Sequence, residues 1–326
     1  MNRNLGRHRT VLLATFAAVG LAGVALARVT HRFPYVSWTR QWSIGIYEGP
    51  SPFDLASAPG AVNPVLSARD VTDVPARFVA DPFMIRRGNR WTMFFEVLNS
   101  LTRQGEIACA SSADGLVWTY GQVVLREPFH LSYPYVFADG EAVYMIPESI
   151  AARSVRLYRA REFPRGWELQ ATLVEEPYGD PSIVRWAGRW WLFAAPWGDA
   201  SLCVFHAERL AGPWIAHPGN PVVRYSPHGA RPGGRVLVDG DRLYRFAQDD
   251  APVYGLQLFA FEITELTTTG YAERLVRGAP VLKPGDERWR SRGMHTADPH
   301  QIAPGRWLAC VDGSRRGLVW ELRSWD

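Results

Sequence analysis

The stretch "FVADPFMIRRGNRWTMFFEV" (78–97) places Asp81 at the start of one apolar run and Glu96 near the end of the next. A turn containing Gly88 separates the two runs, which are rich in aromatic and branched residues, and this pattern is typical of a β-hairpin. In a hairpin the first residues of one strand face the last residues of its partner. We therefore expect both carboxylates at the same open end. Whether they are part of a larger cluster of site residues depends on whether the hairpin is repeated.

Four relatives of this hairpin follow along the chain. Each has a residue before Pro, a short apolar run, a turn with Gly and a second aromatic run, and further strand-like runs separate the units. The four are "SYPYVFADGEAVYMIPES" (132–149), "GDPSIVRWAGRWWLFAAP" (179–196), "ARPGGRVLVDGDRLYRFAQD" (230–249) and "ADPHQIAPGRWLACVDG" (297–313). Four strands repeated at about 50 residues indicate a β-propeller. The sequence predicts an all-β chain with a five-bladed β-propeller.

The ends of the chain are expected to close the ring. The last unit stops after three strand-like runs, the third being "GLVWELRS" (317–324), and "QWSIGIYEGPSPF" (41–53) is predicted to add its missing outer strand. Closure removes exposed sheet edges. A sandwich of two packed sheets does not explain the regular placement of Pro.

The first 32 residues differ from the rest in charge. The net charge is +4, but residues 1–32 contain five Arg and no acid, so the remainder carries −1. A nucleic-acid partner needs a basic stripe, which the body of the chain lacks, so we expect none. Residues 11–27, "VLLATFAAVGLAGVALA", form a 17-residue run without a charge. This predicts an N-terminal transmembrane or signal helix within 1–32, followed by the propeller over 33–326.

Two outcomes remain open for this leader. As a signal-anchor it holds the protein in the membrane with the propeller outside the cytoplasm, in the periplasm, because basic flanks stay inside. As a signal peptide it is cleaved after export. The three cysteines, Cys109, Cys203 and Cys310, match no metal-binding spacing. They are interpreted as buried free thiols, with one disulfide bridge as the alternative. No metal site and no cofactor is predicted.

Propeller geometry predicts where the chemistry lies. The innermost strand of a blade begins at the axis and the second strand returns to the same face, so carboxylates from different blades collect around one mouth. The positions expected there are Asp81, Glu96, Tyr133, Glu148, Asp180, Ala195, Arg231, Gln248, Asp249, Asp298 and Asp312.

The motifs "ADPF" and "GDPS" resemble those of five-bladed propeller glycosidases, the arabinanase–xylosidase and invertase-like families. The resemblance implies that Asp81 is the base or nucleophile and that Asp180 orients the substrate and tunes acidity. These families carry their general acid, a Glu, on the next blade. This chain has Arg231 and Arg235 there instead, so the resemblance assigns no acid.

A second resemblance covers about 85% of the chain, from Trp42 to the end. The segments "FVADPFMI", "HLSYPYVF", "MIPES" and "ARPGGRV" are similar to the N-terminal propeller domain of plant glucosamine inositolphosphorylceramide transferases. Transferase chemistry in those proteins is ascribed to a separate C-terminal domain. The resemblance therefore implies a glycan-related propeller and no particular reaction.

Glycoside cleavage requires one protonated carboxyl group and one carboxylate on opposite sides of the bond. With Asp81 and Asp180 as carboxylates, the acid is predicted to be Glu148, which is flanked by apolar residues and Pro147 in "MIPES", ahead of Glu96. The alternative is that an Asp before Pro only caps a strand start by bonding the backbone, and we favour this for Asp298.

The remaining candidates are interpreted as binding residues. Arg231 and Arg235 suit an anionic group because a guanidinium fork binds carboxylate or phosphate, although pairing with Asp81 or Asp180 in an inert network is the alternative. Trp197 is placed to stack on a sugar. The other candidates are Glu96, His130, His228, Gln248 and Asp249.

Three hypotheses for function follow. The first is a carbohydrate-active protein of the glycoside hydrolase type, acting on a glycan or glycolipid. The second is a non-catalytic domain that binds an anionic glycan. The third is a scaffold that assists a separate glycosyltransferase.

Overall fold

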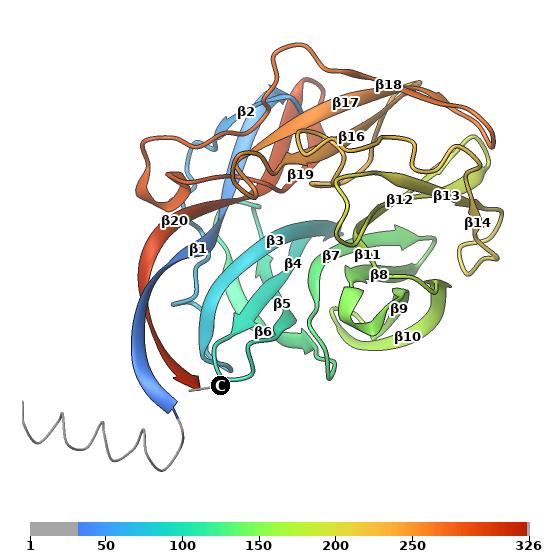
Figure 1. Ribbon diagram of the computed structural model, residues 1–326. Helices are drawn as coiled ribbons and strands as arrows, with labels where there is room; N and C mark the ends of the chain where they lie inside the picture. The colour runs from blue at the N-terminus through green and yellow to red at the C-terminus, as the bar shows by residue number, and fades with distance from the viewer. Residues whose placement is uncertain (1–31, 325–326) are drawn as a thin grey trace, which may run out of the picture. The chain divides into compact units, whose positions relative to one another are not determined.

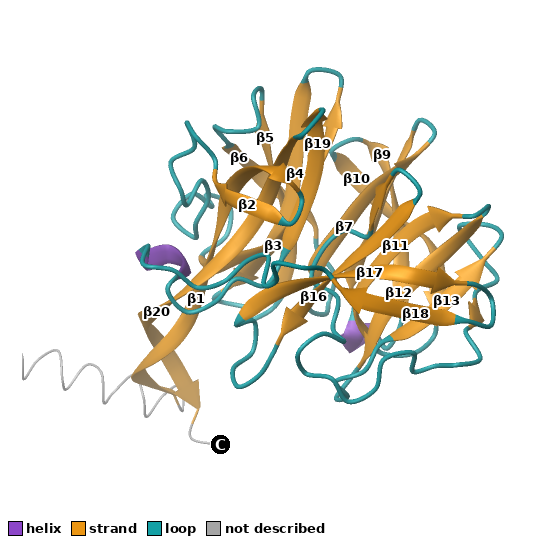
Figure 2. Ribbon diagram, turned by 90° about the horizontal axis from the view of Figure 1, so that it is seen from above, coloured by secondary structure: helices purple, strands orange, loops and turns teal. Residues whose placement is uncertain are grey.

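The computed structural model describes residues 32–324, which are almost entirely strands and loops (Figures 1 and 2). Residues 41–315 form one compact unit, and of a second unit the structure describes 32–40 and 316–324. The predicted leader falls almost wholly on residues 1–31, outside the described part of the chain. Within residues 32–324, no helix has the length and apolar character needed to cross a membrane.

The strands form five four-stranded sheets, and these are the five predicted blades. In three of them the strands pair in chain order from the inside outward: β3 (Ala76–Arg87), β4 (Arg90–Asn99), β5 (Gly105–Ser112) and β6 (Thr119–Leu125); β7 (Ser132–Asp139), β8 (Ala142–Glu148), β9 (Val155–Glu162) and β10 (Arg165–Val174); β11 (Tyr178–Trp186), β12 (Arg189–Pro196), β13 (Cys203–Ala207) and β14 (Ile215–Ala216). The fourth blade comprises β15 (Leu237–Asp239), β16 (Arg242–Asp249), β17 (Gln257–Leu266) and β18 (Tyr271–Leu275). Figure 1 shows β3, β7 and β11 side by side as the inner strands.

The fifth blade closes the ring with both ends of the chain, in the order β19 (Ala297–Ala303), β20 (Arg306–Ser324), β1 (Arg32–Ser51) and β2 (Asp54–Ser57). The prediction of closure is confirmed, but its details were wrong. Residues 41–51 lie in β1, the third strand of the blade, and the outer strand is β2, which begins at Asp54. The run "GLVWELRS" is a continuation of β20 and not a third strand, because no turn interrupts the chain after Gly313.

The inner strand of the fourth blade is shorter than predicted. Residues 230–236 make only isolated bridges, and β15 begins at Leu237. Gly234 donates its N–H to the Tyr133 hydroxyl at 2.6 Å, and a Cβ there would lie 1.9 Å from the carbonyl oxygen of Ala297. The chain contacts the second and fifth blades at this point, and the two glycines of "PGG" permit that close approach.

Aromatic side chains pack between the blades. Phe94 of the first blade meets Trp167 of the second edge-to-face at 5.4 Å, and Phe137 of the second meets Trp190 of the third at 5.8 Å. Burying each such ring stabilises the fold by about 1.5–3 kcal/mol. All three cysteines are buried and free, as predicted, so the alternative of a disulfide bridge was wrong.

Arg235 occupies the core between the inner strands. It ion-pairs with Asp298 at 2.5 Å and donates a hydrogen bond to the carbonyl oxygen of Val136 at 2.9 Å. Burial alone would raise the pKa of Asp298, but Arg235 and His300 lower it to about 2. The interpretation of Arg235 as a clamp for substrate is therefore corrected: its charge is used inside the protein. The structural role favoured for Asp298 agrees with this pair.

Candidate functional site

The residues before Pro in three blades share an unusual backbone conformation. Asp81, Tyr133 and Asp180 have φ angles of 52°, 46° and 48°. The strand register shifts at each of them, between Ala80 and Phe83 in the first blade and at the matching places in the next two. A bulge with positive φ redirects a side chain and costs about 1–3 kcal/mol at a residue other than Gly. Three equivalent bulges thus point these side chains towards one mouth.

Asp81 is held by the fifth blade. Its Oδ1 accepts a hydrogen bond from the Thr296 hydroxyl at 2.9 Å, and its backbone N–H donates to Oδ2 of Asp312 at 3.2 Å. Burial raises the pKa of Asp81 to about 6; repulsion from Asp312 and Asp180 adds to this effect, and attraction to His295 opposes it. Asp81 is therefore mostly ionised at pH 7, yet takes up a proton easily.

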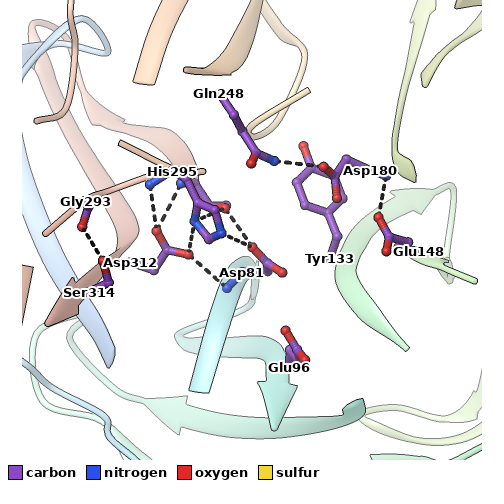
Figure 3. A network of polar contacts seen from close by, with 12 residues as sticks. Asp81, Glu96, Tyr133, Glu148, Asp180, Gln248, Gly293, His295, Asp312 and Ser314 are labelled. Atoms are coloured by element: carbon purple, nitrogen blue, oxygen red, sulfur yellow. Dashed lines mark hydrogen bonds and ion pairs between the residues drawn. The ribbon is translucent and has the colours of Figure 1, made fainter. Parts of the chain in front are cut away.

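His295 lies between two carboxylates (Figure 3). Its Nδ1 lies 2.7 Å from Oδ2 of Asp312 and its Nε2 lies 3.7 Å from Oδ1 of Asp81. The ring stacks on Trp42 at 3.9 Å. Burial lowers the pKa of His295, but Asp312 and Asp81 outweigh burial and the net pKa is raised. The imidazolium form is favoured, and it offsets part of the negative charge at the mouth.

The ligand atoms of Asp81, His295 and Asp312 lie within 4.8 Å of one another, close enough to hold a metal ion. The Asp312 oxygens that could bind a metal ion already accept hydrogen bonds. Oδ1 of Asp312 accepts the backbone N–H groups of His295 and Thr296 at 3.0 and 3.1 Å, and Oδ2 accepts from Asp81 and His295. Both oxygens of Asp312 that a metal ion could bind are thus already engaged in hydrogen bonds.

Asp180 and Glu148 form the second part of the mouth. Oε2 of Glu148 accepts the backbone N–H of Asp180 at 3.1 Å. Oδ2 of Asp180 accepts from the Gln248 amide at 2.8 Å and from Nε of Arg231, whose Nη2 lies 3.6 Å from Glu148. Arg231 also faces the ring of Tyr254 at 5.2 Å.

Glu148 is nearly buried, and its environment favours the neutral form. Burial and the adjacent Asp180 raise the pKa of Glu148 to about 8, although Arg231 acts in the opposite direction. Two carboxyl groups at one mouth, Glu148 and Asp81, therefore have pKa values on opposite sides of pH 7. This separation is how sites assign one acid and one base.

Glu96 faces the space between the two parts of the mouth (Figure 3). Its Oε1 is buried without a hydrogen bond, and Nε2 of His130 lies 3.4 Å away. Nδ1 of His130 accepts the backbone N–H of Gly105, so a neutral His130 carries its proton on Nε2. Burial and the carboxylates of Asp81 and Glu148 raise the pKa of Glu96 well above its usual value.

A cavity of about 280 Å³ opens beside the mouth, at the ends of the third and fourth blades. Its lining includes Arg231, Gly179, Asp250 and Trp197. Trp197 is 67% exposed as a residue, and the Arg231 side chain is 27% exposed. These two side chains are thus accessible to a ligand.

The structure brings most of the predicted site residues together. Asp81, Glu96, Glu148, Asp180, Arg231 and Gln248 surround the mouth. Of the two partners considered for Arg231, Asp180 is confirmed, and Glu148, 3.6 Å away, is the second carboxylate beside it in place of Asp81. His228 and Asp249 are instead bonded to each other at 2.9 Å, outside the lining of the cavity. Asp249 is buried and accepts from the Gln257 amide, so it organises the chain after β16.

Sequence reasoning missed His295 and Thr296 as site residues and gave Asp312 a place but no role. All three belong to the fifth blade, where "MHT" (294–296) comes shortly before the repeated Asp-Pro. The one available signal was a His placed three residues before that Asp. The sequence does not show that Asp312 accepts a hydrogen bond from the backbone N–H of Asp81, which belongs to another blade.

Comparison with known proteins places the chain in context. A family model described as "Glucosamine inositolphosphorylceramide transferase 1, N-terminal" matches residues 38–314. Glucosamine inositolphosphorylceramide transferase 1 of Oryza sativa subsp. japonica is 37% identical over 84% of this chain and 40% of its own length. The protein of that name from Arabidopsis thaliana is 32% identical over 84% of this chain and 39% of its own length. The chain thus spans about two fifths of these relatives.

Solved structures share the fold at low identity. A β-1,2-mannobiose phosphorylase from Listeria innocua has a TM-score of 0.60 and 12% identity, covering 82% of this chain and 96% of its own. An exo-β-1,3-galactanase from Clostridium thermocellum has a TM-score of 0.52 and 16% identity, covering 65% of this chain and 51% of its own. A family 117 glycoside hydrolase from Zobellia galactanivorans has a TM-score of 0.51 and 12% identity, covering 87% and 91%. These likenesses identify the five-bladed propeller alone.

Proposed function

Because the chain belongs to the family of the N-terminal domain of glucosamine inositolphosphorylceramide transferase 1, a glycan-related propeller, we propose that its axial mouth cleaves a glycosidic bond in a glycan or glycolipid. The observation that carries this proposal is the pair formed by Glu148 and Asp81. Their surroundings hold the pKa of Glu148 at about 8 and that of Asp81 at about 6. At pH 7 one carboxyl group is protonated and the other ionised, as glycoside cleavage requires.

In this mechanism Glu148 donates its proton to the glycosidic oxygen as the bond to the anomeric carbon breaks. Asp81 acts on the opposite side, either attacking the anomeric carbon or accepting a proton from the attacking water. Asp180 is held in place by Arg231 and Gln248, which bond the same oxygen, Oδ2. It positions Arg231 and raises the pKa of Glu148 by repulsion.

A hydrolysis screen of the full chain against oligosaccharides and glycolipids tests the proposal. Turnover is expected with the parent protein and a loss of at least about 100-fold with Asp81→Asn or Glu148→Gln. The matched control is Asp139→Asn, which removes an exposed carboxylate at the other end of β7. Equal turnover in all three variants refutes the roles assigned to Asp81 and Glu148.

The second candidate function is binding of an anionic glycan without cleavage. It is favoured by a specific observation: the side chains of Glu148 and Asp180 are only 11% and 3% exposed, whereas Arg231 and Trp197 line the open cavity. A ligand held there meets a guanidinium and an indole before it meets either carboxylate. Binding that is lost in Arg231→Ala, with no turnover of any glycan, supports this function over the first.

The setting of the protein is also a proposal. We propose that the basic and apolar leader exports the propeller from the cytoplasm, either anchoring it to the membrane or being removed afterwards. The curated relatives are named as transferases, and their name includes glucosamine and the lipid inositolphosphorylceramide. This supports a glycolipid as substrate or an accessory role beside a glycosyltransferase. Protease treatment of spheroplasts, whose outer membrane is breached, tests the location: degradation of the propeller is expected, and full protection contradicts it.

A further inference from the structure

A second cavity, of about 650 Å³, lies between the first and second blades. The β3–β4 hairpin, strands β5 and β6, and the β9–β10 turn line it. Asp81 lies in the middle of β3 and Arg87 at its end, six residues later, so the cavity lies roughly 20 Å from the axial mouth at 3.3 Å per residue. It is a separate feature of the molecule, and the proposed reaction does not use it.

The lining carries three arginines and no carboxylate. Arg87 contacts Glu141, whose side chain is fully exposed, at 3.3 Å. Arg90 donates to the Ser111 hydroxyl at 2.7 Å. The Arg165 side chain forms no hydrogen bond or ion pair with any residue of the described chain. At least one guanidinium is therefore available to a ligand, and the other two are held only by exposed or neutral partners.

The nearby acid is already engaged. Asp73 lies close enough to Cys109, a residue of the lining, for its charge to raise the pKa of the Cys109 thiol. Its oxygens accept hydrogen bonds from the Tyr120 hydroxyl at 2.5 Å and from the backbone N–H of Val123 at 2.7 Å. Asp73 is thus satisfied without the three arginines, and the cavity keeps an excess of positive charge.

The rest of the lining suits a compact polar body. The ring of Phe163 lies under the Arg87 guanidinium at 5.7 Å and offers an apolar face. Thr92 and Ser111 contribute hydroxyl groups, and the small residues Ala110 and Gly121 leave room for a ligand. A cavity of this volume admits a small-molecule ligand.

We infer that this cavity binds a phosphate ester of a sugar or polyol. The phosphate is held by Arg165 and Arg90, because guanidinium groups bind phosphate oxygens in two-pronged geometry. The carbohydrate body packs on Phe163 and bonds to the hydroxyl groups. The ester is either a soluble sugar phosphate or the headgroup of an anionic lipid, and these share the chemistry that the cavity recognises.

Calorimetric titration of the full chain with glucose 1-phosphate, glucose and inorganic phosphate tests this inference, together with sedimentation of phosphatidylcholine vesicles with and without phosphatidic acid. Arg165→Gln and Arg90→Gln each remove one charge from an exposed side chain, so both are expected to fold. The matched control is Arg277→Gln, an equal change at an exposed position in the fourth blade. Alkylation of Cys109, which lines the cavity, is followed by mass spectrometry as a second readout.

The expected result is that glucose 1-phosphate binds and glucose does not, with binding weakened about tenfold or more in Arg165→Gln and Arg90→Gln and unchanged in Arg277→Gln. Bound ester is expected to slow alkylation of Cys109. Vesicle binding that needs phosphatidic acid and is lost in Arg165→Gln assigns the site to a lipid headgroup. The inference is overturned if no phosphate compound binds better than its neutral counterpart, or if Arg165→Gln behaves as Arg277→Gln does. Neither Asp81 nor Glu148 lines this cavity, so failure of this inference and failure of the proposed reaction are distinguishable.

Discussion

Replacing Glu148 with Gln is expected to stabilise the protein above neutral pH. Gln has the shape of a protonated Glu and keeps an oxygen that can accept the backbone N–H of Asp180. Burial and Asp180 raise the pKa of Glu148 from 4.5 to about 8 in the folded protein. The folded protein therefore holds a proton on Glu148 between these pH values, whereas the unfolded chain releases it.

The size of the effect follows from proton linkage. Stability from a raised pKa is fully present below about pH 4.5 and is lost as the pH rises through about 8. At 1.36 kcal/mol per pH unit, the free energy of unfolding falls by about 5 kcal/mol across this range, and entry of water into the mouth reduces that to about 2–5 kcal/mol. Glu148→Gln has no group that titrates at this position. Its free energy of unfolding therefore falls less with pH and exceeds that of the parent protein at pH 8.

Urea unfolding followed by tryptophan fluorescence, at a series of pH values between about 4.5 and 8.5, measures this difference. The control is Glu208→Gln, whose parent side chain is 81% exposed, and its difference from the parent protein is expected to stay constant with pH. The reasoning is refuted if the parent protein and Glu148→Gln lose stability in parallel, or if the variant is the less stable of the two at pH 8.

Three further perturbations have defined outcomes. Arg235→Ala leaves Asp298 buried without its partner, so the free energy of unfolding is expected to fall by about 3–5 kcal/mol in urea titrations. Trp197→Ala removes an exposed ring, so calorimetry is expected to show glycan binding weakened by roughly 2- to 10-fold with an unchanged melting temperature. Burial lowers the pKa of His295 and Asp312 is the group that raises it most, so Asp312→Asn is expected to lower this pKa. Nuclear magnetic resonance of the ring protons measures it.

Each of these has a result that contradicts it. For Arg235 the control is Arg161→Ala, which breaks an exposed ion pair worth under about 1 kcal/mol, and an equal loss in both variants argues against the buried pair. Full glycan affinity in Trp197→Ala removes the indole from the binding surface. A His295 pKa unchanged by Asp312→Asn means that Asp312 does not stabilise the imidazolium.

The fold was predictable because its signal is local and repeated. Each hairpin carries its Xaa-Pro, glycine turn and aromatic strand within about 20 residues, and five copies reinforce one interpretation. The shortened strand before Leu237 was not predictable in the same way. It depends on the contact of Gly234 with Tyr133 and Ala297, which come from other blades and leave no mark in the local pattern.

The site was predictable to the extent that strand order decides it. Asp81, Glu148 and Asp180 stand at equivalent ends of inner hairpins, so the topology alone places them at one mouth. The partners of each side chain depend on contacts across the ring instead. Arg231 and Arg235 look alike in "ARPGGRV", yet one reaches Asp180 at the mouth and the other Asp298 in the core.

The central claim is that Glu148 and Asp81 act on opposite sides of one glycosidic bond. The most direct test is a crystal structure of Glu148→Gln with an oligosaccharide that the parent protein cleaves or binds. We predict a glycosidic oxygen within about 3 Å of the residue 148 amide and an anomeric carbon facing Asp81. A sugar seated beside Trp197 and Arg231, with no atom reaching either residue 148 or Asp81, would contradict the claim.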